Sequence, residues 1–169
     1  PERMVTIKSS TTELLLALGL GDRIVGTAFQ DGPVPSEWAD AAASIPSISD
    51  FVPNEEAVLQ LTPDLVFGGW ESNFASDGVG ERAELESLGV NTYVAPSACR
   101  SIQPPKLTWD DVFGDISEVA SIFRVDASAL VADQQARVDA LLADKSGQGR
   151  TALWYSSGDD TPYVGAGLG

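Results

Sequence analysis

Side chains suited to holding a small molecule follow several apolar runs that we predict to be strands. They offer aromatic rings, a hydroxyl, an amide, a carboxylate and a guanidinium. The candidate ligand-binding residues are Thr11, Phe29, Gln30, Trp70, Glu71 and Arg100, together with Phe51 in a loop that is expected to lie nearby. In an open α/β sheet, ligands bind outside the carboxyl ends of the strands. Rings with a few polar neighbours suit a large ligand with flat apolar faces and polar edges, so the sequence predicts non-covalent binding.

Structural roles are the alternative for these residues. Phe51 and Trp70 could pack in the core, although little apolar sequence surrounds Trp70. Arg100 could pair with a ligand carboxylate or cap its own loop. Cys99 beside it is interpreted as a small, partly buried thiol rather than a metal ligand, because one soft ligand alone fixes no metal.

The sequence contains no arrangement typical of catalysis. It has no His, no Gly-x-Ser-x-Gly turn and no phosphate loop, and the GLGD segment at residues 19–22 follows a predicted helix instead of a strand. We therefore predict no catalytic residue, no metal site and no cofactor. One alternative is a flavodoxin-like or Rossmann-like enzyme domain that binds a flavin or nucleotide at the helix start near residues 9–12. Another is a protein interaction module, which should expose a large apolar patch.

Composition narrows the class of protein. The 169 residues are 43% apolar, enough for a core, and carry 10 basic against 25 acidic side chains, a formal charge of −15. Such a charge argues against nucleic acid as a partner and against adsorption to anionic lipid. A single Cys and the absence of His exclude a disulfide framework and the usual zinc sites. No apolar run approaches the roughly 20 residues of a membrane span.

Hydrophobic patterning predicts strands that alternate with helices, and hence an α/β fold with a mostly parallel sheet. The predicted strands are residues 4–8, 22–27, 65–67, 90–95 and 151–155. The predicted helices are residues 12–18, 36–41, a short helix capped by Asn54, then 78–88, 109–123 and 126–143.

The sequence also predicts a helix cap, a long loop and the buried side of two elements. Ser10 and Glu13 have the spacing of a capping box, and residues 33–53 are predicted to be a long loop around the brief helix. One side of the last helix is predicted to be mostly apolar and is marked by Leu130, Val131, Val138, Leu141 and Leu142, with Gln134 among them. Trp154 and Tyr155 are assigned to the core. No element is predicted after residue 156, so we expect the chain to be a fragment whose last strand lacks its cover.

Four segments in this order resemble the periplasmic-binding-protein family of ABC importers, in the branch that serves ferric siderophores, haem and cobalamin. The segments are RMVTI with STTE at residues 3–13, LGLGDRIVG at 18–26, NEE at 54–56 and LTPDLV at 61–66. The resemblance covers residues 1–95 closely and residues 109–145 in outline.

The resemblance implies a Rossmann-like N-terminal lobe over residues 1–108, a helical segment with a long lobe-connecting helix over 109–147, and the first strand of a truncated second lobe over 148–169. It implies that a small-molecule metal chelate binds between two lobes and that a monomer delivers it to ABC permease subunits. Ferric siderophore or corrinoid is the expected ligand, because haem is disfavoured without any His. The expected location is extracytoplasmic, with a lipid anchor on the outer face of the cytoplasmic membrane.

The resemblance also implies a role for Glu56. In the family a glutamate at this position forms salt bridges to permease arginines, and Glu56 matches by its spacing ahead of LTPD. The alternative is a first-turn glutamate that complements the helix dipole, a role that Glu55 fills equally well.

Overall fold

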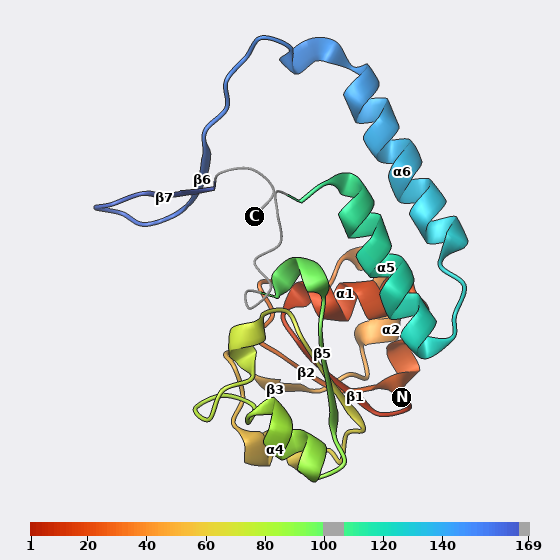
Figure 1. The fold of residues 1–169 in the computed structure, drawn as a ribbon, viewed down its shortest axis with the longest axis vertical. Helices are drawn as coiled ribbons and strands as arrows, with labels where there is room; N and C mark the ends of the chain where they lie inside the picture. The colour runs from red at the N-terminus through yellow and green to blue at the C-terminus, as the bar shows by residue number, and fades with distance from the viewer. Residues whose placement is uncertain (100–106, 166–169) are drawn as a thin grey trace.

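The computed structural model describes residues 1–99 and 107–165. Within them a parallel five-stranded sheet carries helices on both faces (Figure 1). Its strands are β1 (Met4–Ile7), β2 (Ile24–Ala28), β3 (Ser47–Ser49), β4 (Leu65–Gly68) and β5 (Asn91–Val94). They lie in the order β3-β2-β1-β4-β5, so the chain reverses its direction across the sheet between β1 and β4. The α/β fold with a parallel sheet is as predicted.

The helices are α1 (Ser9–Ala17), α2 (Ala39–Ala42), α3 (Glu55–Leu59), α4 (Arg82–Ser87), α5 (Trp109–Phe123) and α6 (Ser128–Ala143). Asn54 caps α3 as predicted, because its Oδ1 accepts a hydrogen bond from Ala57 N at 2.9 Å. α5 has the predicted bounds. None of the described helices is long and apolar enough to cross a membrane.

Two apolar clusters hold the sheet between its helices. β1 is buried on both faces, so its successive side chains alternate between the clusters. Met4 packs with residues of α1 and α5, and the members of this cluster are Met4, Leu15, Leu16, Leu20, Ile24, Leu65, Phe67, Val119 and Phe123. Val5 and Ile7 pack on the other face, toward α3 and α4, with Ala28, Val58, Val66, Val79, Leu85 and Val90.

The predicted start of α1 is wrong. The helix begins at Ser9, so Ser10 lies inside it, and the N-cap residue Lys8 makes no side-chain cap hydrogen bond. Lys8 has φ 88°, a conformation that turns the chain from β1 straight into α1 without a linker. The Thr11 hydroxyl instead donates to the carbonyl oxygens of Ile7 and Lys8, at 3.0 and 2.9 Å.

Two further elements differ from the prediction in the lobe. α4 begins at Arg82 instead of residue 78, because Gly80 has φ 101° and its N–H donates to Ala75 O in a turn. Within the predicted loop at 33–53, the polar edge strand β3 pairs with β2. Its sequence, SIS, carries no strand pattern of its own.

The structure of the last part of the chain also differs from the prediction. Strand β6 (Trp154–Ser157) pairs antiparallel with β7 (Tyr163–Gly165), a hairpin that the sequence analysis missed. Trp154 and Tyr155 are 76% and 55% exposed, so their assignment to the core is wrong. The hairpin lies apart from the five-stranded sheet, and none of the described helices lies over it (Figure 1).

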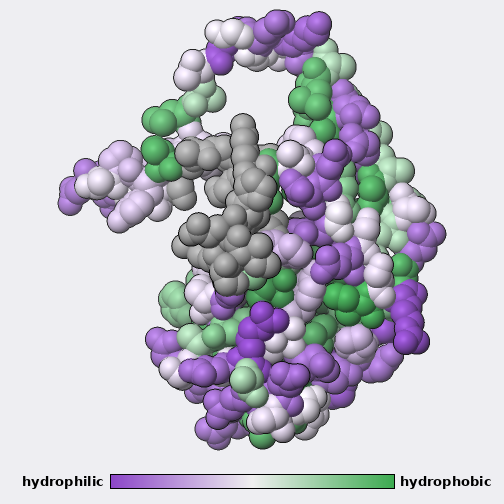
Figure 2. All heavy atoms as spheres, viewed as in Figure 1, coloured by the Kyte–Doolittle hydropathy of each residue, from purple (hydrophilic) through white to green (hydrophobic). Residues whose placement is uncertain are grey.

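The predicted apolar side of α6 is only partly buried. Val138 is buried, whereas Leu141 and Leu142 are 73% and 67% exposed. Figure 2 shows apolar side chains on the upper part of α6 and again at the base of the hairpin. α6 therefore packs on α5 near its start and extends away from the lobe toward its end (Figure 1).

Candidate functional site

Three predicted aromatic residues, which follow β2, β3 and β4, meet at the carboxyl ends of these strands. The ring centroid of Phe29 lies 6.1 Å from that of Phe51 and 5.7 Å from that of Trp70, with the Phe29 and Trp70 rings nearly perpendicular. Phe51 is 73% and Trp70 46% exposed, so core packing does not explain either ring. We call Phe29, Phe51 and Trp70 the aromatic cluster. It lies where the strand order reverses, which is where open α/β sheets bind ligands.

The sequence analysis missed Lys8, which completes this cluster. Its Nζ lies 4.2 Å from the ring centroid of Phe29 and 4.5 Å from that of Trp70, and it forms an ion pair with Asp31. The side chain is only 9% exposed. A charged residue directly after a buried strand was the available signal, but it was read as the last residue of that strand.

Unusual backbone geometry brings these groups together. Phe29 has φ 53° and Lys8 has φ 88°, both uncommon for residues with a side chain. Gly69 allows close approach, because a Cβ on it would lie 2.7 Å from Lys8 Cβ. The Trp70 N–H donates to Oδ1 of buried Asn73 at 2.9 Å, which fixes the start of its loop.

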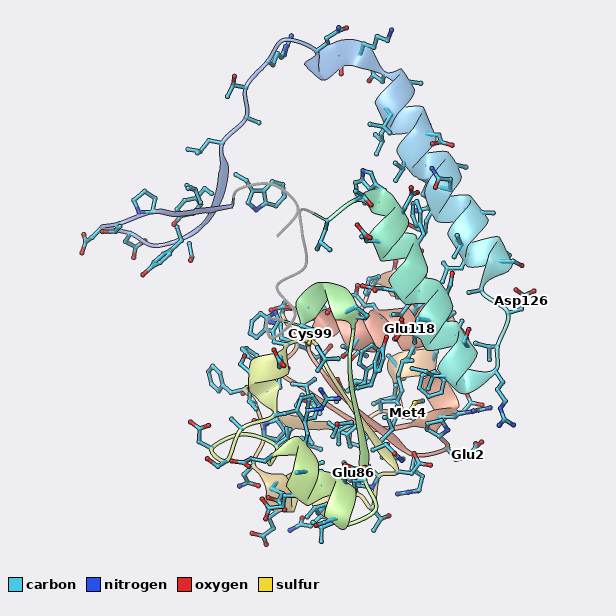
Figure 3. All side chains as sticks on the ribbon, in the orientation of Figure 1. Glu2, Met4, Glu86, Cys99, Glu118 and Asp126 are labelled. Atoms are coloured by element: carbon cyan, nitrogen blue, oxygen red, sulfur yellow. The ribbon has the colours of Figure 1, made fainter. Side chains whose placement is uncertain are left out.

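The predicted polar residues lie nearby but have partners within the protein. Thr11 is buried with its hydroxyl donating to backbone oxygens, as described above. Gln30 donates its amide N–H to Ala28 O at 2.9 Å, and Glu71 accepts from the buried Cys99 thiol at 3.7 Å. Cys99 follows β5 at the same end of the sheet (Figure 3). Arg100, the remaining candidate, lies outside the described residues.

A cavity of about 220 Å³ lies beside the aromatic cluster, between α1 and α5. Its lining is mainly apolar, with a few polar side chains, and consists of Ser10, Thr11, Leu14, Phe67, Gly68, Gly69, Ala95, Ala98, Val112, Asp115 and Ile116. Gly69 borders both this cavity and Lys8, so the two features are neighbours. In the part of the chain that the structure describes, no three His, Cys, Asp or Glu side chains are grouped to hold a metal ion.

Glu55 and Glu56 differ in their surroundings. Glu55 is half-buried, and its carboxylate lies 2.9 Å from the point where a Cβ on Gly80 would be. Glu56 is exposed, and both glutamates line a shallow depression of about 540 Å³ together with Leu59 and Gln60. Packing therefore accounts for Glu55 and leaves Glu56 facing solvent.

Tyr93 links β5 to α5 near the cavity. Its hydroxyl donates to Glu118 Oε1 at 2.9 Å, and its ring packs edge-on against Phe67. Burial raises the pKa of Tyr93 well above its usual value, and the hydrogen bond and charge of Glu118 raise that pKa further. Glu118 lies on α5 above the sheet (Figure 3). At neutral pH the uncharged phenol therefore ties the helix to the sheet.

Comparison with known proteins identifies relatives. Residues 4–169 match a family model described as "Periplasmic binding protein". The chain is 37% identical over 76 residues to an uncharacterized ABC transporter substrate-binding lipoprotein, YvrC, of Bacillus subtilis, covering 45% of this chain and 23% of that protein. It is 39% identical over 66 residues to the vitamin B12-binding protein of Yersinia pestis, covering 38% of this chain and 22% of that protein.

Comparison with solved structures points to the same kind of protein. A periplasmic binding protein from Veillonella parvula superposes with a TM-score of 0.85 at 27% identity, over 97% of this chain and 54% of that chain. A protein of an ABC-type Fe3+-hydroxamate transport system from Saccharomonospora viridis superposes at 0.70 and 27% identity, over 92% and 54%. This chain thus spans just over half the length of these two structures. The family consists of binding proteins, which agrees with the prediction of no enzyme, and the chain belongs to the periplasmic binding protein family.

Proposed function

We propose that this chain is the N-terminal lobe of the substrate-binding component of an ABC importer, and that the component captures a metal chelate, a ferric siderophore or a corrinoid. The observation that carries the proposal is the exposed aromatic cluster at the strand-order reversal. Exposed rings at this position offer flat contact area that the core does not need. Relatives whose names mention vitamin B12 and Fe3+-hydroxamate support this ligand class.

Ligand capture would depend on two lobes that close around the ligand. A ligand that contacts both lobes favours the closed form by the difference in its affinity for the closed and open forms. In this proposal the aromatic cluster and the adjacent cavity supply one lobe's half of the contact. The hydroxyl of Thr11 and the amide of Gln30 would then act mainly by holding the loops that present the rings.

Delivery would require a surface that the permease recognises. We propose Glu56 for this role, because it is exposed on α3 while Glu55 packs against the turn at Gly80. The protein would work outside the cytoplasmic membrane as a lipid-anchored monomer, a location that the lipoprotein relative in Bacillus subtilis supports.

The test is calorimetric titration of the full-length gene product with a ferric trihydroxamate, a ferric tris-catecholate, cyanocobalamin and haem. We expect a ferric siderophore or cyanocobalamin to bind, and Trp70→Ala to weaken that binding about tenfold or more, since stacked rings often dominate binding. Leu88→Ala is the matched control, because Leu88 is 54% exposed on the surface after α4. Binding of a flavin or nucleotide in place of any chelate would instead support the enzyme-domain alternative.

A further inference from the structure

Lys8 is enclosed by groups that differ in how firmly they are held. Two sides of its ammonium face the rings of Phe29 and Trp70, and the Asp31 carboxylate pairs with it on another. The Lys8 side chain is 9% exposed, whereas that of Asp31 is 61% exposed. Asp31 is therefore the solvent-exposed member of the ion pair, and Lys8 is the buried one.

The Asp31 carboxylate can leave without moving its loop. The Asp31 backbone N–H donates to Ser9 Oγ at 2.7 Å, so the main chain stays attached to the start of α1 when the side chain rotates. An exposed carboxylate loses little when it returns to water. The cost falls on Lys8, because a buried charge without a partner is strongly unfavourable.

This asymmetry selects the kind of ligand that can displace Asp31. A neutral group that pushed the carboxylate aside would leave the ammonium unpaired. An anionic oxygen would restore the pair. Ring faces carry the negative part of the aromatic quadrupole, so an anion gains nothing from Phe29 and Trp70 by themselves and depends on Lys8.

We propose that an anionic oxygen of the ligand replaces the Asp31 carboxylate at the Lys8 ammonium, so that the site prefers chelates with net negative charge, such as carboxylate or catecholate complexes, over neutral ones. This inference rests on the proposed binding function. Lys8 acts as the specificity-determining residue, and Asp31 holds the place of the ligand while the site is empty.

The experiment compares an anionic chelate, ferric citrate or a ferric tris-catecholate, with a neutral ferric trihydroxamate on the full-length gene product. Asp31→Asn keeps the shape of Asp31 but removes the competing charge. We expect it to raise affinity for the anionic chelate about tenfold or more and to leave the neutral chelate unchanged. Lys8→Met should abolish the preference for the anionic chelate.

Asp50→Asn is the matched control, because Asp50 is an exposed carboxylate next to Phe51 in the chain. If Asp50→Asn raised affinity for the anionic chelate as much as Asp31→Asn does, the cause would be a general decrease in charge repulsion, and the proposed exchange at Lys8 would be wrong. A lower affinity for the anionic chelate in Asp31→Asn would also contradict the exchange. If Lys8→Met fails to fold, Asp31→Asn and Lys8→Arg, which keeps the charge and should keep the preference, decide the matter. Chelate binding without charge preference overturns this inference alone, and absence of any chelate binding overturns the proposed function with it.

Discussion

Gly69 and Lys8 are in such close contact that a Cβ atom on Gly69 would lie 2.7 Å from Lys8 Cβ and 2.8 Å from Lys8 Cγ. The peptide after β4 therefore forms one wall of the space that holds the lysine. Any side chain at position 69 has to move either Lys8 or the loop that carries Trp70.

Gly69→Ala should consequently damage both stability and binding. We expect unfolding free energy to fall by about 1–3 kcal/mol, as for overpacking of a tight site, together with weaker ligand binding. Denaturant unfolding and calorimetry measure the two effects. Gly114→Ala in α5 is the control, since nothing lies within 4 Å of its added Cβ and a helical Gly to Ala change should stabilise by about 0.5–1 kcal/mol. A Gly69→Ala protein as stable as the parent would contradict the close contact.

At Lys8, glycine should be more favourable for stability than alanine, the opposite of the usual order inside a helix. Because φ is 88° there, Lys8→Gly should be more stable than Lys8→Ala by about 1 kcal/mol, although both lack the ammonium. At Ser10, inside α1, the order should be the usual one, with Ser10→Ala above Ser10→Gly by a similar amount. Thermal unfolding of the four variants measures both differences. A Lys8→Ala protein more stable than Lys8→Gly would show that the backbone at position 8 is not strained.

Asp64 fastens the start of the chain to the turn before β4. Its carboxylate accepts hydrogen bonds from the N–H groups of Glu2 and Arg3, at 2.7 and 3.1 Å, and the Arg3 guanidinium donates to Leu61 O and Thr62 O. Asp64→Ala should lower unfolding free energy by about 1.5–3 kcal/mol, since hydrogen bonds to a charged group are lost.

Urea unfolding at constant pH measures the effect of Asp64→Ala. Asp77→Ala, at an exposed turn position, provides the comparison and should change stability by less than about 0.5 kcal/mol. Equal effects of the two substitutions would show that the Asp64 contacts contribute nothing.

Tyr93 should make stability fall at alkaline pH. Its pKa is raised in the folded protein, so the fold favours the protonated phenol, and this contribution is complete below the ordinary tyrosine pKa of about 10. It is then lost as the pH rises above that value, when ionisation would place a phenolate beside Glu118.

Tyr93→Phe should therefore lose less stability than the parent between about pH 9.5 and 11. Tyr163→Phe, at a residue that is 68% exposed, should follow the parent curve. Denaturant midpoints across this range make the measurement. Parallel curves for Tyr93→Phe and the parent would show that the phenol ionises normally.

Glu56→Arg should abolish transport while ligand affinity stays intact, because the residue is exposed on α3 and belongs neither to the aromatic cluster nor to the lining of the adjacent cavity. Uptake of labelled chelate by cells and calorimetry of the purified protein separate the two properties. Glu86→Arg makes the same charge change on exposed α4 and should transport normally (Figure 3). Normal uptake with Glu56→Arg would rule out the docking role.

Elements with a strong local pattern could be predicted from the sequence. β4 contains the continuous apolar run LVF at residues 65–67, and α5 begins at Trp109 and ends at Phe123 as predicted. The edge strand β3 could not be predicted, because it is defined by hydrogen bonds to residues distant in the sequence. Thr27 N donates to Pro46 O, and Phe29 N donates to Ser49 O. Short polar strands of this kind exist through their neighbours.

The candidate site divides in the same way. Phe29 and Trp70 were found because they follow predicted strands and Phe51 because its loop was expected nearby, and the sheet topology brings the three together. Lys8 was missed because its partners lie more than twenty residues away and its own backbone conformation has no sequence signature. Likewise, the turn at Gly80 that distinguishes Glu55 from Glu56 is visible only in three dimensions.

α6 gives the molecule a mechanical property. Its 16 residues form a rod of about 24 Å, attached to the lobe near Ala127 and exposed toward its far end. At the connection, Arg124 has φ 56° and Asp126 accepts a hydrogen bond from Ser128 N at 2.8 Å (Figure 3). A rotation of about 5° there displaces the far end of the rod by about 2 Å. The few residues between α5 and α6 therefore determine the direction in which this rod leaves the lobe.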